Sequence, residues 1–151
     1  MKMLKPGDKV PDFSALDQDE KKRSLSDYKG KKLIVFFYPA ASTPTCTVEA
    51  CNLRDNYALL KKKGYALLGV SADTVKKQSN FAKKHELKFP LLSDVDHKII
   101  DAFGVWGPKK FMGLSFDGIY RTTFVIDENG IVERVIDKVK SKDHAAQLLE
   151  G

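Results

Sequence analysis

The hydrophobic residues form short runs that are separated by polar, often lysine-rich segments. Residues 33–38, LIVFFY, are continuously apolar, which predicts a strand buried on both faces of a sheet. Residues 65–73, YALLGVSAD, predict a second buried strand, and residues 89–94, FPLLSD, predict a short third one. Two alternating runs flank ENG at residues 128–130, so an antiparallel hairpin with a short turn is expected there.

The segments between these strands carry helix signals. Thr43 is a favourable N-cap and Pro44 a favourable first helical residue, and the helix is expected to run to Lys63, where Gly64 ends it. Three further helices are predicted, the last of them with Ser141 as its N-cap: residues 74–85, 96–105 and 141–150.

This order of elements predicts an α/β protein with a mixed β-sheet flanked by helices on both faces, which is a thioredoxin-like order. The 151 residues fit a single domain, 1–151, that is long enough to bury a core. Residues 107–118, GPKKFMGLSFDG, show no regular pattern. They are expected to form a long irregular segment that borders a functional site.

The composition narrows the function. Hydrophobic residues make up 42% and charged residues 30% of the chain, as in ordinary globular proteins. The formal net charge is +6, yet only four of the 26 basic residues are arginine, so scattered lysines favour solubility and no nucleic-acid partner is expected. Apolar runs fall short of the ~20 residues of a membrane span, and the N-terminus lacks a secretion signal, which predicts a cytoplasmic protein without membrane contact.

The chain has only two cysteines, Cys46 and Cys51, and both lie in the predicted helix that begins after Thr43. Cys46 falls in the first turn, where unpaired backbone amides and the helix dipole favour the reactive thiolate. The alternative is that Cys46 is a small buried hydrophobic residue, the usual role of a cysteine. The three histidines lie far from the cysteines without metal-ligand spacing, so no metal site is expected.

The spacing of the two cysteines limits what they can do together. On an ideal helix, residues five apart are separated by ~7.5 Å of rise and about 140° of rotation, which places their Cα atoms roughly 8–9 Å apart. A disulfide requires less than about 7 Å. A Cys46–Cys51 bridge therefore requires the helix to unwind, which leaves two interpretations: two unrelated thiols, or a redox switch built on local unfolding.

Several segments resemble one protein family. FYPAASTPTCTVEACNLRD, residues 37–55, resembles the active-site segment of peroxiredoxins, and its C-x4-C spacing is similar to that of the bacterioferritin comigratory protein, or Q-type, subfamily. GVSADTVKKQSNFAKKHELKFPLLSD, FGVWGPKKFMG and GIYRTTFVIDENG are similar to the same subfamily in order and spacing. The resemblance covers nearly the whole chain and implies a single thioredoxin-like peroxiredoxin domain.

By this resemblance, Cys46 is the peroxidatic cysteine and Cys51 the resolving cysteine, and Thr43 and Arg121 complete the catalytic site. The planar guanidinium of Arg121 suits this role, because it can stabilise both the thiolate and the charge on the peroxide oxygens. The alternative for Arg121 is a surface strand residue in an ion pair. The alternative for Thr43 is a helix cap alone, although one hydroxyl can serve both purposes.

The resemblance also places Pro39, Pro44 and Thr45 around the substrate pocket. Thr45 stands where the family usually has glycine, and its β-branched side chain is expected to affect peroxide access or the unwinding of the first turn. Glu49 and Arg54, on the same helix, are either an exposed pair or a local support for the site. Support is favoured, and neither residue is placed in the catalytic core.

The expected function is a thiol peroxidase that reduces hydrogen peroxide and organic hydroperoxides without a metal, haem or flavin. Cys46 becomes a sulfenic acid, Cys51 condenses with it, and thioredoxin or a similar dithiol reduces the bridge. The subfamily implies a monomer.

Two alternatives remain. One is a thiol-disulfide oxidoreductase of the same fold, against which the C-x4-C spacing and Arg121 count, and the other is a basic binding module in which the cysteines are incidental.

Overall fold

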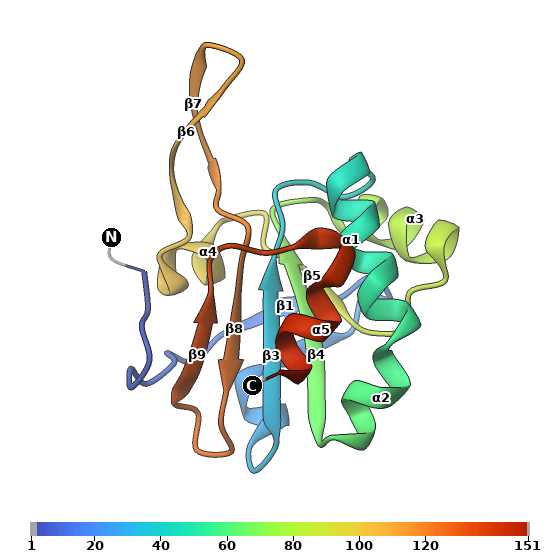
Figure 1. Ribbon diagram of the computed structural model, residues 1–151, viewed down its shortest axis with the longest axis vertical. Helices are drawn as coiled ribbons and strands as arrows, with labels where there is room; N and C mark the ends of the chain where they lie inside the picture. Colours follow the sequence, from blue (N-terminus) through green and yellow to red (C-terminus); the bar gives the residue numbers. More distant parts are fainter. Residues whose placement is uncertain (1–2, 151) are drawn as a thin grey trace.

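The computed structural model describes residues 3–150. Within this range, a mixed sheet of seven strands runs through the middle of the molecule in the order β2-β1-β5-β4-β3-β8-β9 (Figure 1). The predicted buried strands and the C-terminal hairpin are confirmed. The strands of this sheet are β1 (Ser14–Leu16), β2 (Lys22–Ser24), β3 (Lys32–Phe37), β4 (Tyr65–Ser71), β5 (Leu91–Ser93), β8 (Thr122–Ile126) and β9 (Val132–Ile136).

Strand β3 lies in the interior of the sheet, and both of its faces are apolar. It pairs in parallel with β4 and antiparallel with β8, so that Ile34 lies beside Leu67 on one side and Val125 on the other. Its side chains alternate between the faces. Val35 packs into the core on one face, and Ile34 and Phe36 pack into the core on the other.

Helices cover both faces of the sheet, as the order of elements predicts. One helix packs on the face to which Val35 points: α4 (Lys98–Phe103). On the opposite face lie α1 (Pro44–Asp55), α2 (Tyr57–Lys62), α3 (Val75–His85) and α5 (His144–Leu149). Short 3-10 helices occur at η1 (Leu25–Tyr28) and η2 (Ser141–Asp143). No helix within residues 3–150 is both long and apolar enough to cross a membrane.

The expectation of one helix over residues 44–63 is wrong. The backbone leaves helical geometry at Asn56, with φ −112° and ψ 9°, and this separates α1 from α2. The Asn56 side-chain amide donates to the Asn52 carbonyl at 2.8 Å and so competes with the backbone bond that would continue the helix. Ser141 does not cap the last helix either, because it begins η2, and α5 starts only after Asp143.

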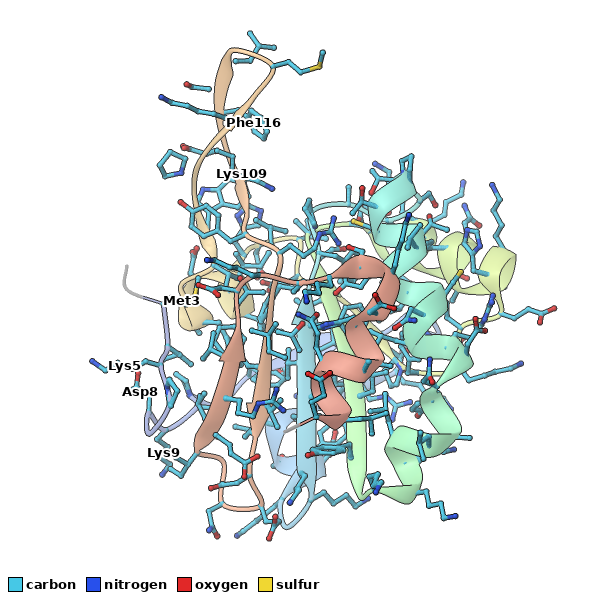
Figure 2. The ribbon with its side chains drawn as sticks, viewed as in Figure 1. Met3, Lys5, Asp8, Lys9, Lys109 and Phe116 are labelled. Carbon is cyan, nitrogen blue, oxygen red and sulfur yellow. The ribbon has the colours of Figure 1, made fainter. Side chains whose placement is uncertain are left out.

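Residues 107–118 do not form the irregular segment that was expected. They belong to a two-stranded antiparallel hairpin that stands out from the body of the molecule (Figure 1), built from β6 (Trp106–Phe111) and β7 (Leu114–Ile119). Both residues of its turn adopt the left-handed conformation that type I′ turns require, with φ of 51° at Met112 and 81° at Gly113. Phe116 projects from the hairpin (Figure 2) and is 48% exposed, so the strands lack the buried alternation by which a strand is recognised.

The side chain of Asn52 fixes α1 to the C-terminal segment. It donates to the Lys142 carbonyl at 2.8 Å and accepts the Ala145 backbone N–H at 2.8 Å. Ala145 lies in the first turn of α5, where backbone N–H groups have no acceptor within the helix. Asn52 therefore supplies from α1 the cap that the Asp143 side chain does not supply.

Replacement of Asn52 by alanine removes both hydrogen bonds and leaves the Ala145 N–H without a protein acceptor. We expect the free energy of unfolding to fall by about 1–3 kcal/mol, as measured by urea denaturation followed by circular dichroism. The control is Asn80→Ala on the exposed face of α3, which should change the free energy by less than about 0.5 kcal/mol. Equal losses in the two variants would show that Asn52 does not fix α1 to α5.

Candidate active site

The first turn of α1 presents Cys46 just beyond the loop that follows β3. Thr43 has the extended backbone of an N-cap, with φ −78° and ψ 154°, and Pro44 is the first helical residue, as predicted. The Thr43 hydroxyl donates to the Ala40 carbonyl at 3.0 Å, and its oxygen accepts no backbone N–H of the first turn. Among the described residues, the N-cap side chain therefore leaves the amides of the first turn without an acceptor.

A chain of buried and partly buried hydrogen bonds holds the loop between β3 and α1. The Ala41 N–H donates to the Asp73 carboxylate at 2.7 Å, and the Ser71 hydroxyl donates to the same oxygen at 2.7 Å. Gln78 donates to the Ser71 hydroxyl at 2.9 Å and accepts the Tyr38 hydroxyl at 2.6 Å. The loop is therefore tied to the end of β4 and to α3.

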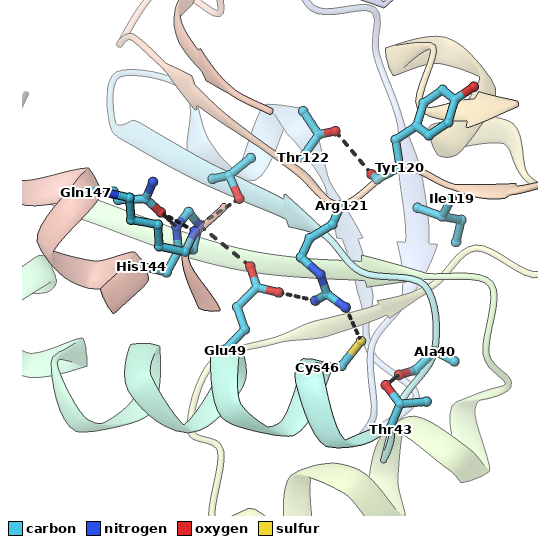
Figure 3. A network of polar contacts seen from close by, with 12 residues as sticks. Ala40, Thr43, Cys46, Glu49, Ile119, Tyr120, Arg121, Thr122, His144 and Gln147 are labelled. Carbon is cyan, nitrogen blue, oxygen red and sulfur yellow. Dashed lines mark hydrogen bonds and ion pairs between the residues drawn. The ribbon is translucent and has the colours of Figure 1, made fainter. Parts of the chain in front are cut away.

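Arg121 joins the site from the position just before β8. Its Nη2 donates to the Cys46 sulfur at 3.1 Å and its Nη1 donates to Glu49 Oε1 at 2.6 Å (Figure 3). Cys46 and Glu49 are three residues apart on α1, so they meet the guanidinium from the same face of the helix. Burial by itself lowers the pKa of Arg121, but the adjacent Cys46 and Glu49 outweigh it and raise that pKa, so Arg121 stays a cation. The Arg121 side chain is only 19% exposed, so Arg121 is not the surface strand residue of the alternative interpretation.

Glu49 is fully buried beneath Arg121. Its Oε2 lies 3.7 Å from His144 Nε2 and has no hydrogen-bond partner in the described part of the chain. Burial raises the pKa of Glu49 from 4.5 to about 7, against the lowering effect of Arg121. Of the two interpretations of Glu49, the exposed pair with Arg54 is wrong, because Arg54 bonds to its neighbour Asp55.

His144 was not among the residues that the sequence placed near the site. It is fully buried on α5 together with Ala145 and Leu148. A histidine on the buried face of an otherwise apolar helix is the sequence signal that points to a buried polar partner. That signal does not identify the partner, because Glu49 comes from a helix almost a hundred residues earlier in the chain.

The other predicted residues lie around the first turns of α1. Cys46 and Cys51 are both free thiols in an unbroken helix, with Cys46 only 2% exposed and Cys51 half-buried. Pro39 is half-buried, whereas Pro44 and Thr45 are exposed at the helix start. Within residues 3–150, no three histidine, cysteine, aspartate or glutamate side chains are grouped so as to hold a metal ion.

Residues 6–135, most of the chain, match the family described as AhpC/TSA. The chain belongs to this family. The putative peroxiredoxin bcp of Haemophilus influenzae is 49% identical over 150 residues, which cover 99% of this AhpC/TSA chain and 97% of the relative. Peroxiredoxin Bcp of Escherichia coli K12 is 51% identical over 144 residues, with coverage of 95% and 92%. The resemblance to peroxiredoxins of the bacterioferritin comigratory protein group is confirmed.

Solved structures confirm the thioredoxin-like architecture of this AhpC/TSA protein. Peroxiredoxin Q of Xanthomonas campestris matches with a TM-score of 0.86 and 35% identity, covering 91% of this chain and 87% of that one. A cysteine-to-serine variant of Xylella fastidiosa PrxQ matches with a TM-score of 0.91 and 28% identity, covering 99% and 95%. The peroxidoxin BcpB of Mycobacterium tuberculosis matches with a TM-score of 0.86 and 38% identity, covering 97% of this chain and 95% of that one.

The raised pKa of Glu49 makes the stability of the fold depend on pH in a defined direction. The folded protein keeps a proton on Glu49 up to about pH 7, whereas an ordinary glutamate loses it near 4.5, so the folded state binds more protons between these values. The contribution of Glu49 to stability is therefore fully present below pH 4.5 and is lost as the pH rises to about 7.

Glu49→Gln tests this dependence, because glutamine keeps the size of the side chain and an acceptor for Arg121 but cannot ionise. We expect the free energy of unfolding of the wild type, minus that of the variant, to decrease from pH 4.5 to about 7 and then to level off. Urea denaturation at a series of pH values measures it. Glu133→Gln at an exposed position of β9 is the control. A difference that rises over the same range would contradict a raised pKa for Glu49 in the folded protein.

Proposed function

We propose that this AhpC/TSA protein is a thiol peroxidase in which Cys46 is the peroxidatic cysteine and Cys51 the resolving cysteine. The observation that carries the proposal is the 3.1 Å contact between Arg121 Nη2 and the Cys46 sulfur, in the first turn of a helix. A neighbouring cation and a helix start both stabilise a thiolate, which is the nucleophilic form of cysteine. The name peroxiredoxin, borne by the relatives from Haemophilus influenzae and Escherichia coli, agrees with this chemistry.

The Cys46 thiolate attacks one oxygen of a hydroperoxide, so that a sulfur–oxygen bond forms as the oxygen–oxygen bond breaks. Sulfur is oxidised by two electrons to a sulfenic acid, and the departing oxygen takes up a proton and leaves as water or an alcohol. Negative charge moves from sulfur to the departing oxygen during this step. The contact between the Arg121 guanidinium and the sulfur supports a role in this step, because its remaining N–H donors can stabilise that charge.

Hydrogen peroxide and organic hydroperoxides are the proposed substrates. A structure of the bacterioferritin comigratory protein of Xanthomonas campestris concerns alkyl peroxide reduction by that protein. In this chain the Thr43 hydroxyl donates a hydrogen bond to the Ala40 carbonyl, and its oxygen keeps lone pairs that can accept a hydrogen bond from a peroxide. Half-buried Pro39 and exposed Pro44 and Thr45 surround the helix start and form the proposed rim of the substrate site.

The resolving step requires α1 to unwind between Cys46 and Cys51. Oxidation favours this unwinding, because a neutral sulfenic acid no longer offers Arg121 a negative charge at 3.1 Å. The Cys51 thiol then attacks the sulfenic sulfur, and a disulfide and water are formed. The residue after Cys51 is Asn52, which binds Lys142 and Ala145 at the start of the C-terminal helix. The segment that unwinds therefore begins at Cys46, which Arg121 contacts, and ends before Asn52.

A dithiol protein, most simply thioredoxin, reduces the Cys46–Cys51 bridge by exchange through a mixed disulfide. Both cysteines belong to one chain, so a monomer is sufficient for the proposed cycle. The cycle suits the cytoplasm, where dithiol reductants keep thiols reduced. We accordingly propose that residues 1–151 act as one domain and that the redox centre needs no bound metal, haem or flavin.

Titration of the reduced protein with hydrogen peroxide tests the roles of the cysteines. The wild type should lose both of its thiols without gaining oxygen, because an internal bridge forms. Cys51→Ser should retain oxygen as a sulfenic or higher acid, and Cys46→Ser should consume essentially no peroxide. Thiol counts and intact mass measure these outcomes. Rapid peroxide consumption by Cys46→Ser would reject the assignment.

Arg121→Lys keeps the positive charge but loses the planar fork that reaches both Cys46 and Glu49. We expect the second-order rate with hydrogen peroxide, measured by stopped flow in a single turnover, to fall by about 100-fold. Arg23→Lys is the matched control, because Arg23 pairs with Asp17 in the β1–β2 hairpin, and its rate should not change. An unchanged rate in Arg121→Lys would remove Arg121 from the reaction.

A further inference from the structure

Behind Arg121, two ionisable side chains from different helices lie against each other (Figure 3). Glu49 of α1 and His144 of α5 are both completely buried, and Glu49 Oε2 lies 3.7 Å from His144 Nε2. This carboxylate oxygen has no hydrogen-bond donor among the described residues. A buried anionic oxygen without a donor is unfavourable, and a proton on either side chain removes the problem.

The hydrogen bonds around His144 leave one ring nitrogen to exchange a proton. Gln147 donates to the Lys138 carbonyl at 3.0 Å and accepts the Lys140 N–H at 2.9 Å, so its Oε1 is fixed as an acceptor. His144 Nδ1, 2.9 Å from that oxygen, therefore carries a hydrogen in both charge states. In the neutral ring Nε2 accepts the Thr123 hydroxyl at 2.8 Å, and Nε2 is the site at which a further proton binds.

We propose that Glu49 and His144 hold one exchangeable proton between them, that this pair gains the proton when Cys46 ionises, and that it gives the proton up when Cys46 is oxidised. The inference rests on the proposed role of Cys46 as the peroxidatic cysteine. His144 does not touch the reacting atoms. It acts through Glu49 and Arg121 and is therefore a positioning residue for the charge at Cys46.

The net charge of the buried group explains why the proton follows Cys46. When Cys46 is a thiolate and Glu49 a carboxylate, the single cation Arg121 faces two anions, and one negative charge is left uncompensated in the interior. A proton on the Glu49–His144 pair removes that charge. Once Cys46 is a neutral sulfenic acid, Arg121 and ionised Glu49 neutralise each other, so the pair no longer needs the proton.

The step balances without a proton from solvent. Ionisation of Cys46 transfers one proton from the thiol to the pair. The thiolate, the protonated pair and one hydroperoxide then give the sulfenic acid, an alcohol or water, and the deprotonated pair. One sulfur–oxygen bond forms, one oxygen–oxygen bond breaks, and sulfur loses the two electrons that the peroxide gains.

Burial favours the uncharged form of both members of the pair. Burial raises the pKa of Glu49 to about 7 in spite of Arg121. Burial lowers the pKa of His144. The hydrogen bond to Gln147 opposes this change, and the charge of Arg121 adds to it. A single proton that resides on Glu49 therefore leaves both side chains uncharged, and His144 Nε2 is the nearby site to which it can move.

Two further ionisable groups lie near this site, and neither supplies the exchangeable proton. Tyr38, at the end of β3, stays neutral because burial raises its pKa. Lys109 of β6 donates to the Ile119 carbonyl at 2.9 Å. Burial and Arg121 lower the pKa of Lys109 while Cys46 raises it, so this cation lies within electrostatic reach of the site and favours the thiolate.

Carbon-13 NMR of carboxyl-labelled glutamate tests the coupling without any turnover. Cys46→Asp puts a negative charge in the place of the thiolate, and Cys46→Ser puts a neutral group there. We expect the titration midpoint of Glu49, identified by the loss of its signal in Glu49→Gln, to lie about one pH unit higher in Cys46→Asp than in Cys46→Ser. Equal midpoints would overturn the inference, whether or not the protein reduces peroxides.

Ultraviolet absorbance of the thiolate, measured against pH in a Cys51→Ser background, gives a second test. Glu49→Gln should move thiolate formation about one pH unit lower, because Arg121 then has a single anionic partner. His144→Gln should move it higher, because the new amide can donate to Glu49 but cannot take its proton. The matched control is His85→Gln, which replaces a histidine whose ring packs on Phe81, and it should show no shift.

The inference would be rejected if Glu49→Gln and His144→Gln shifted the pH of thiolate formation in the same direction, or if neither variant shifted it. A purely structural role of the two residues would not produce shifts in opposite directions. Opposite shifts in a protein that consumes no peroxide would reject the proposed function alone. Nitrogen-15 spectra of the wild type keep the test valid if a variant does not fold. His144 should carry its hydrogen on Nδ1 at neutral pH, and a ring protonated on Nε2 alone would overturn the inference.

Discussion

The site is organised around one partly buried cation that faces two groups able to carry negative charge. Arg121 can reach both because β8 runs antiparallel to β3, with Thr122 beside Phe37, so the residue before β8 lies where β3 ends and α1 begins. Removal of these groups from water costs several kcal/mol for each ion, and only their mutual contacts offset that cost. The central sheet register therefore fixes the chemistry of Cys46, since a shift of one residue in the β3–β8 pairing would turn Arg121 to the other side of the sheet.

The contacts that hold the Cys46 sulfur also hold α1 in its helical form. Arg121 contacts Cys46 and Glu49 in the first two turns, and Asn52 binds the start of α5 in the third. The helix ends soon afterwards at Asn56. An intact α1 keeps the two sulfurs too far apart to bond, so formation of a bridge requires the first of these contacts to be lost while the rest of the sheet and its core remain in place.

The features that depend on local pattern were predictable, and those that depend on packing were not. The uninterrupted apolar run of β3 identifies an interior strand of the sheet, and the Thr43–Pro44 helix start identifies the place of Cys46. Strands β1 and β2 are three residues long and half exposed, so nothing in the sequence distinguishes them from a loop. The β6–β7 hairpin was missed because its strands pair with each other instead of burying an alternating face. The pairing of Glu49 with His144 arises only when α5 packs on α1.

The packing of α5 on α1 couples the unwinding of α1 to the protonation of Glu49. α5 contacts α1 through Glu49 and Asn52, and these two residues flank Cys51 on the sequence. If unwinding separates Glu49 from His144, its carboxyl group enters water and its pKa returns from about 7 toward 4.5, so opening releases a proton over that range. Opening therefore becomes easier as the pH rises from 4.5 to about 7, because the ionised carboxylate is stable in water and unfavourable in the closed site. In the proposed cycle, oxidation of Cys46 acts in the same direction, since it removes the thiolate charge that binds Arg121 to α1.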